Sequence, residues 1–158
     1  MARCLELAEE GAGFVSPNPM VGCVIVGRGG TILGKGWHRQ YGGPHAEVNA
    51  IAAAEEAGHA DDLSSATLYV NLEPCNIHGR TPPCTDMIMR NKIPRVVIGC
   101  TDPNPQVAGR GVARLRAAGV EVLVAEDPQP YMALNRRFFV NQQLKRPYVS
   151  LKWAQSAN

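Results

Sequence analysis

Three separate segments of this sequence carry side chains that commonly bind metal ions. His45 lies in the run Pro-His-Ala-Glu at positions 44–47, Cys75 follows Glu-Pro, and Cys84 follows Pro-Pro. One histidine and two cysteines give three protein ligands, the number used by catalytic zinc sites whose fourth position holds water. Thiolate and imidazole ligands also have the softness that zinc prefers. The fold must therefore bring three distant segments together, and we expect His45, Cys75 and Cys84 to bind Zn²⁺.

Glu47 follows two residues after His45 and is not needed as a metal ligand. Zinc lowers the pKa of bound water from ~15.7 to about 7, and a nearby carboxylate can then move protons between water and a substrate. Residues two apart on a helix point roughly 200° from each other, so His45 and Glu47 share a target only if it lies beyond the helix end. We expect Glu47 to be the catalytic acid and base, at the N-terminus of a helix.

The pattern H-x-E…P-C-x-x-C is typical of zinc-dependent nucleobase deaminases. This chain departs from it in one respect, because eight residues separate Cys75 from Cys84. The wider loop, together with Ser-Pro-Asn-Pro-Met-Val-Gly at 16–22, Asp-Pro-Asn-Pro at 102–105 and Ala-Gly-Arg-Gly at 108–111, resembles the deaminase domain of the bifunctional riboflavin-biosynthesis pyrimidine deaminase/reductase. The resemblance covers the whole chain.

The resemblance implies a reaction and several substrate contacts. The reaction is zinc-dependent hydrolytic deamination of 2,5-diamino-6-(5-phosphoribosylamino)pyrimidin-4-one to the 5-amino-pyrimidinedione plus ammonia, an early step of riboflavin biosynthesis. Asn18 is implied to contact the pyrimidine ring, and Ala46 is placed in the same substrate site. The loop with Asp102 and Asn104, with the turn around Gly109, is implied to bind ribose and phosphate. For Asn18 and the 102–104 loop, ordinary turn formation is the alternative interpretation.

The loop between the two cysteines holds two more candidate contacts. Arg80 lies in Gly-Arg-Thr close to the metal, and a guanidinium can bind phosphate oxygens through two parallel hydrogen bonds. An unpaired surface arginine is the alternative. Most relatives have a histidine where this chain has Ile77, so a substrate group there would lose a hydrogen bond. We predict that His78 supplies the missing imidazole, provided that the chain is kinked at Asn76.

The sequence predicts a mixed sheet between helices. Helices are expected at 2–11, 44–57, 85–91, 109–118 and 128–144, and strands at 21–26, 31–35, 66–72, 95–100 and 120–125. The first two strands form a hairpin, whereas the strand–helix–strand order over 95–125 implies a right-handed crossover and parallel strands. We therefore expect the three-layer α/β/α cytidine-deaminase-like fold, with a mixed sheet of about five strands of which the last two are parallel.

Composition limits the class of protein. The chain has 158 residues, a length that suits one domain, and its net charge of +2 demands no nucleic-acid partner. The apolar runs have the length of strands, so no membrane span is expected, and a cytoplasmic location is predicted. Five cysteines without a secretion signal do not suggest a disulfide framework. Cys4, Cys23 and Cys100 are interpreted as buried thiols.

Residues 1–145 are expected to form the deaminase domain, and residues 146–158 resemble the linker and first strand of the family's reductase domain. No G-x-G-x-x-G fingerprint occurs, so reductase activity is expected on an absent domain or a separate chain. A homo-oligomer, a dimer or tetramer, is also expected. Two alternatives stay open. One is a deaminase of another pyrimidine, nucleoside or tRNA base, and the other is a catalytically silent, zinc-stabilised binding module.

Overall fold

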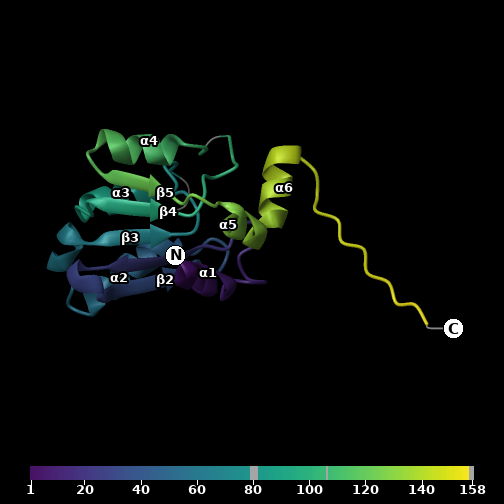
Figure 1. The fold of residues 1–158 in the computed structure, drawn as a ribbon, viewed down its shortest axis with the longest axis horizontal. Coiled ribbons are helices and arrows are strands. Elements are labelled where there is room, and N and C mark those ends of the chain that lie inside the picture. The colour runs from purple at the N-terminus through teal and green to yellow at the C-terminus, as the bar shows by residue number, and fades with distance from the viewer. Residues whose placement is uncertain (79–81, 106, 157–158) are drawn as a thin grey trace.

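The computed structural model describes residues 1–78, 82–105 and 107–156 (Figure 1). Its centre is a five-stranded sheet in the order β2-β1-β3-β4-β5. The strands are β1 (Gly22–Val26), β2 (Ile32–Trp37), β3 (Thr67–Val70), β4 (Arg95–Ile98) and β5 (Glu121–Val124). β1 pairs antiparallel with both β2 and β3, whereas β3, β4 and β5 are parallel. The predicted mixed sheet is confirmed, and its parallel part includes β3 as well as the last two strands.

Helices cover both faces of the sheet. They are α1 (Ala2–Glu9), α2 (Ala46–Glu56), α3 (Cys84–Arg90), α4 (Arg110–Ala117), α5 (Gln129–Leu134) and α6 (Arg136–Leu144). The alternation along β1 shows the two layers, because Ile25 packs with α2, α3 and α4, whereas its neighbour Val24 packs with α1. The three-layer α/β/α arrangement is therefore confirmed. Within the described residues, no helix has the length and apolar character needed to cross a membrane.

The predicted single helix over 128–144 is wrong, because the chain forms two helices that meet at Asn135. The amide of this residue pairs with the backbone of Met20: its Oδ1 accepts from Met20 N at 2.8 Å, and its Nδ2 donates to Met20 O at 2.9 Å. Asn135 is buried, and its backbone leaves the helical region at φ −103° and ψ 23°. Hydrogen bonds to a residue far away in the sequence therefore break the helix, and helical periodicity carries no sign of them.

Glycines on β2 allow α2 to lie directly against the sheet. A Cβ added at Gly36 would meet Ala50 N at 2.5 Å and Ala46 O at 2.8 Å. We predict that Gly36→Ala lowers the free energy of unfolding by about 1–3 kcal/mol, because α2 must move outward to relieve the overlap. Denaturant unfolding tests this. Gly43→Ala is the control, since a Cβ there meets its nearest atom only at 3.2 Å. Equal stability of both variants would contradict the prediction.

Candidate metal centre and active site

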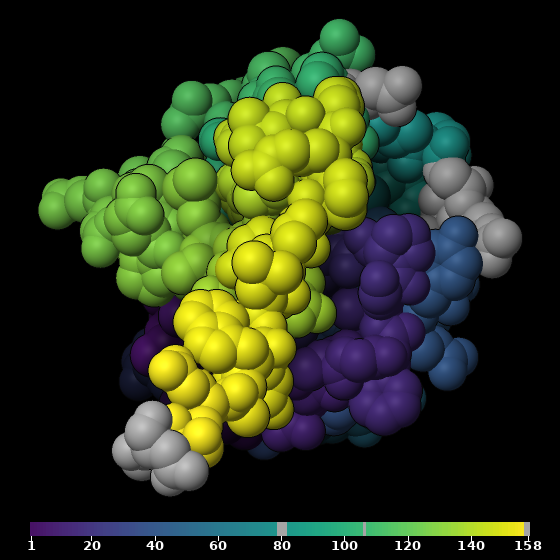
Figure 2. Space-filling model, turned by 90° about the vertical axis from the view of Figure 1, so that its right-hand side faces the viewer, coloured from purple at the N-terminus to yellow at the C-terminus, as the bar shows by residue number. Residues whose placement is uncertain are grey.

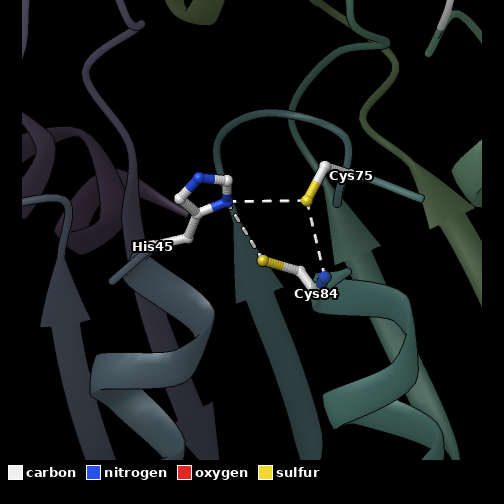
Figure 3. Close-up of side chains that lie close together, drawn as sticks. All are labelled: His45, Cys75 and Cys84. Carbon is white, nitrogen blue, oxygen red and sulfur yellow. Dashed lines mark hydrogen bonds between the residues drawn. The ribbon is translucent and has the colours of Figure 1, made fainter. Parts of the chain in front are cut away.

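The three predicted metal ligands converge at the carboxyl end of β3 (Figure 3). His45 is the residue immediately before α2, Cys75 follows β3, and Cys84 is the first residue of α3. His45 Nδ1 lies 3.5 Å from Cys75 Sγ and 3.3 Å from Cys84 Sγ. All three ligand atoms lie within 4.8 Å of one another. The amino termini of α2 and α3 both lie at this cluster, and the position of the first was predicted from His45 and Glu47.

The cluster fits zinc by its spacing as well as by its chemistry. Zn–S and Zn–N bonds of about 2.3 and 2.0 Å in tetrahedral geometry place a nitrogen and a sulfur ligand roughly 3.5 Å apart. The observed nitrogen–sulfur distances are 3.3 and 3.5 Å. Hydrogen bonding with Cys84 lowers the pKa of the Cys75 thiol to about 4, which favours its thiolate, the form that binds metal. The backbone N–H of Cys84 also donates to Cys75 Sγ at 3.4 Å.

Glu47 lies in the first turn of α2 and is only 3% exposed. Burial raises the pKa of its carboxyl group. It lines a cavity of about 320 Å³ whose wall also includes His45 and Cys75. Asn18, Asp102 and Asn104, which the resemblance implied as substrate contacts, line the same cavity. The fold therefore brings segments that are more than 80 residues apart in the sequence to one chamber.

His38 is a cavity residue that the sequence analysis missed, because its neighbours in the sequence include no other metal-binding side chain. Its side chain is buried and lines the cavity. Nδ1 lies 3.0 Å from Pro44 O, an acceptor, so Nδ1 carries the hydrogen. Nε2 can then accept from Asn18 Nδ2, 3.2 Å away. Burial lowers the pKa of His38, which favours this neutral form. His38 therefore orients the Asn18 amide, with its nitrogen turned toward the imidazole.

Asp102 and Asn104 lie on the loop after β4, at the edge of the sheet that also carries Cys75. Asp102 Oδ1 accepts the backbone N–H of Asn104 at 2.7 Å, which forms a tight local turn. Burial raises the pKa of the Asp102 carboxyl to about 6. The run therefore forms a loop turn, which is the alternative interpretation, and the same residues line the cavity, so their contact with substrate stays a prediction.

Helix α6 supplies a wall of the cavity that the sequence did not indicate. The cavity lining includes Phe138, Asn141 and Gln142. Because α6 begins directly after the helix break at Asn135, this break sets the direction of the helix that forms the wall. Figure 2 shows the C-terminal part of the chain, in yellow, in front of the N-terminal residues in purple, because the chain after α6 runs away from the body of the molecule in Figure 1. A second cavity of about 540 Å³ lies between these parts, lined by residues from 12–20 and 134–148. Its lining includes neither Glu47 nor a metal ligand.

Ala46 and His78, two of the predicted substrate residues, do not line the cavity in the described part of the chain. The Ala46 side chain is fully buried in the core, so a contact from this residue can come only from its backbone. The His78 side chain is 75% exposed, with Nε2 3.8 Å from Asp86 Oδ2, and among the described residues it is not part of the cavity lining. Arg80 lies outside the described residues. The substrate contacts of His78 and Arg80 therefore stay predictions.

Comparison with known proteins defines the class. Residues 1–100 match the family model described as "Cytidine and deoxycytidylate deaminase zinc-binding region". The chain belongs to this family, and the zinc prediction is confirmed by the match together with the ligand cluster.

Within this family, the chain is similar to proteins named for riboflavin biosynthesis. The chain is 51% identical over 158 residues to riboflavin biosynthesis protein RibD of Actinobacillus pleuropneumoniae, covering 100% of this chain and 40% of that protein. It is 47% identical over 156 residues to RibD of Escherichia coli, with 96% and 40% covered. Among solved structures, it is similar to the diaminohydroxyphosphoribosylaminopyrimidine deaminase/5-amino-6-(5-phosphoribosylamino)uracil reductase of Thermotoga maritima, with a TM-score of 0.87, 47% identity and 94% and 41% covered. The chain thus spans about 40% of the length of these relatives.

Proposed function

We propose that this chain is the deaminase part of a riboflavin-biosynthesis enzyme. It converts 2,5-diamino-6-(5-phosphoribosylamino)pyrimidin-4-one to the 5-amino-pyrimidinedione and ammonia. The observation that carries the proposal is the shared cavity, whose lining joins the metal ligands His45 and Cys75 and the acid Glu47 to the residues Asn18, Asp102 and Asn104. The names of the RibD relatives and of the Thermotoga maritima enzyme support the choice of substrate.

The residues of the chain divide the chemistry between them. Zinc, when bound to His45, Cys75 and Cys84, makes water a nucleophile at neutral pH. Overall, water forms a C–O bond at the ring carbon that carries the 2-amine, the C–N bond breaks, and ammonia leaves. The Glu47 carboxylate transfers one proton of the water to the ring nitrogen beside the reacting carbon, and then transfers the second, from the newly added hydroxyl, to the departing amine, which leaves as ammonia. The burial of Glu47 keeps bulk water from competing for these protons.

Substrate orientation comes from the opposite walls of the cavity. The Asn18 amide, held by His38 at 3.2 Å, binds the polar edge of the pyrimidine ring. Asp102 and Asn104 bind the ribose arm, and Ala46 contributes a backbone contact at the start of α2. Arg80 binds the phosphate. Under the same proposal, residues 1–145 form the deaminase domain. Residues 146–158 are the linker and the start of a reductase-like strand, and the reductase activity belongs to an absent domain or a separate chain. The protein acts in the cytoplasm as a homo-oligomer, either a dimer or a tetramer.

Ammonia release from competing substrates tests the proposal. The zinc-loaded chain is expected to deaminate the phosphoribosyl-diaminopyrimidine and to leave cytidine, guanine and a tRNA anticodon stem unchanged. The dephosphorylated pyrimidine is expected to react much more slowly. Preferential turnover of cytidine, guanine or the tRNA would establish the alternative deaminase, and no turnover of any substrate by the zinc-loaded chain would favour the silent binding module.

A further inference from the structure

Glu73 is a buried carboxylate beside the metal centre to which the mechanism gives no part. It is 4% exposed, lies two residues before the metal ligand Cys75, and lines the same cavity. Its side chain turns toward the loop between β4 and α4, and its own backbone N–H donates to Cys100 O at 2.9 Å. The carboxylate therefore lies between the segment that binds metal and the loop that carries Asp102 and Asn104.

Four backbone N–H groups donate to this one carboxylate. Oε2 accepts from Asp102 at 3.1 Å and from Gly109 at 2.9 Å, and Oε1 accepts from Gly111 at 2.9 Å and from Val112 at 3.2 Å. Asp102 lies near the beginning of the loop, and the other three donors lie at its end and in the first turn of α4. An ionised carboxylate has about four acceptor positions and no donor, so the four bonds use its whole capacity.

The loop is also bonded within itself. Asn104 O accepts from Val107 N and Ala108 N, both at 2.8 Å, and Val107 O accepts from Arg110 N at 2.7 Å. Glu73 joins the two ends of this compact turn and attaches them to the segment that carries Cys75. The negative charge of Glu73 is also favourable at the amino end of α4, where free N–H groups point outward. The turn around Gly109, implied by the resemblance to bind phosphate, thus already has Gly109, Gly111 and Val112 bonded to Glu73.

We propose that Glu73 is a positioning residue for the deamination. Its carboxylate holds the loop that carries Asp102 and Asn104 at a fixed distance from the zinc ligand Cys75. This inference rests on the proposed function. Glu73 acts through the loop, since its carboxylate is fully used by backbone donors. The distance between the reacting ring carbon and the ribose arm is constant in the substrate, so a fixed distance between the metal and Asp102 and Asn104 aids productive binding.

The isosteric variant Glu73→Gln tests the proposal. The amide keeps one acceptor atom and replaces the other by a donor, so two of the four N–H groups face an NH₂ group whichever way the amide is turned. In the zinc-loaded chain, hydrogen exchange is expected to accelerate at the amides of Asp102, Gly109, Gly111 and Val112, with zinc content unchanged. Glu121→Gln is the control, because the Glu121 side chain is exposed and, within the described residues, pairs with the Arg95 guanidinium, away from the cavity. It should leave the exchange of these four amides as it is.

A double-mutant cycle separates positioning from general stability. Glu73→Gln is expected to lower kcat/KM by ~10-fold or more, mainly through a higher KM, but by no more than ~2-fold in a chain that already carries Asn104→Ala, because effects transmitted through one loop are not additive. Multiplicative effects of the two substitutions would overturn the proposal, and so would unchanged exchange at the four amides. A wild-type chain inactive on the phosphoribosyl substrate would instead contradict the proposed function, while the exchange experiment still decides whether Glu73 holds the loop.

Gly111→Ala is a second test of the proposal, which applies even if the Glu73→Gln chain does not fold. A Cβ at Gly111 would overlap the carbonyl oxygen of Pro74, so the start of α4 must move away from Glu73 while the carboxylate itself is intact. The same four amides are expected to exchange faster, and KM is expected to rise in the same direction. Wild-type exchange and KM in a folded Gly111→Ala chain would overturn the proposal.

Discussion

Replacing Glu47 by glutamine is expected to lower the turnover number by ~10²-fold or more while the zinc content stays the same. The amide has nearly the size of the carboxylate, so the first turn of α2 and the cavity wall keep their shape. It cannot accept the protons of water and transfer them to the ring nitrogen and the leaving amine. Ammonia release gives the turnover number, and metal analysis of the same preparation gives the zinc content.

Glu55→Gln is the matched control for this experiment. Glu55 lies on the same helix and is exposed, so the identical chemical change occurs away from the cavity. Wild-type turnover is expected for the control. Normal turnover in Glu47→Gln would show that another group moves the proton, and loss of zinc in that variant would show that Glu47 supports the metal site instead.

Cys84→Ser is expected to remove most of the bound zinc and, with it, all measurable deamination. A serine hydroxyl is not ionised near neutral pH and is a harder ligand than a thiolate, so only His45 and Cys75 remain as effective ligands. Because zinc binds the folded chain, its loss should also lower the melting temperature. Metal analysis after dialysis and thermal unfolding measure the two effects.

Cys4→Ser serves as the control for the cysteine substitution. Cys4 is also fully buried, but its thiol donates to Tyr69 O at 3.4 Å, and a serine hydroxyl can donate to the same oxygen. Zinc content is expected to match the wild type. Undiminished zinc in Cys84→Ser would contradict the ligand assignment, whatever the activity of that variant.

Much of the metal centre could be predicted because its chemistry is local. His45 and Glu47 are neighbours in the sequence, and the start of α2 follows from an alanine-rich run after Pro44. Cys75 lies on the segment that follows β3, and Cys84 follows two prolines that precede α3. Short-range patterns of this kind predict where each strand ends and each helix begins. When these ends lie at the same edge of the sheet, the side chains that they carry come together.

The sequence by itself determined the hairpin and the parallel pair at the end of the sheet, and it predicted the three side chains that cluster at the candidate metal centre and the acid beside them. The tertiary structure alone decided three features: the helix break at Asn135, the orientation of Asn18 by His38, and the four amides held by Glu73. In each of them a side chain is bonded to a group distant in the sequence. Amide, imidazole and carboxylate groups carry no local sign of a remote partner, so only the folded chain shows where their hydrogen bonds lead.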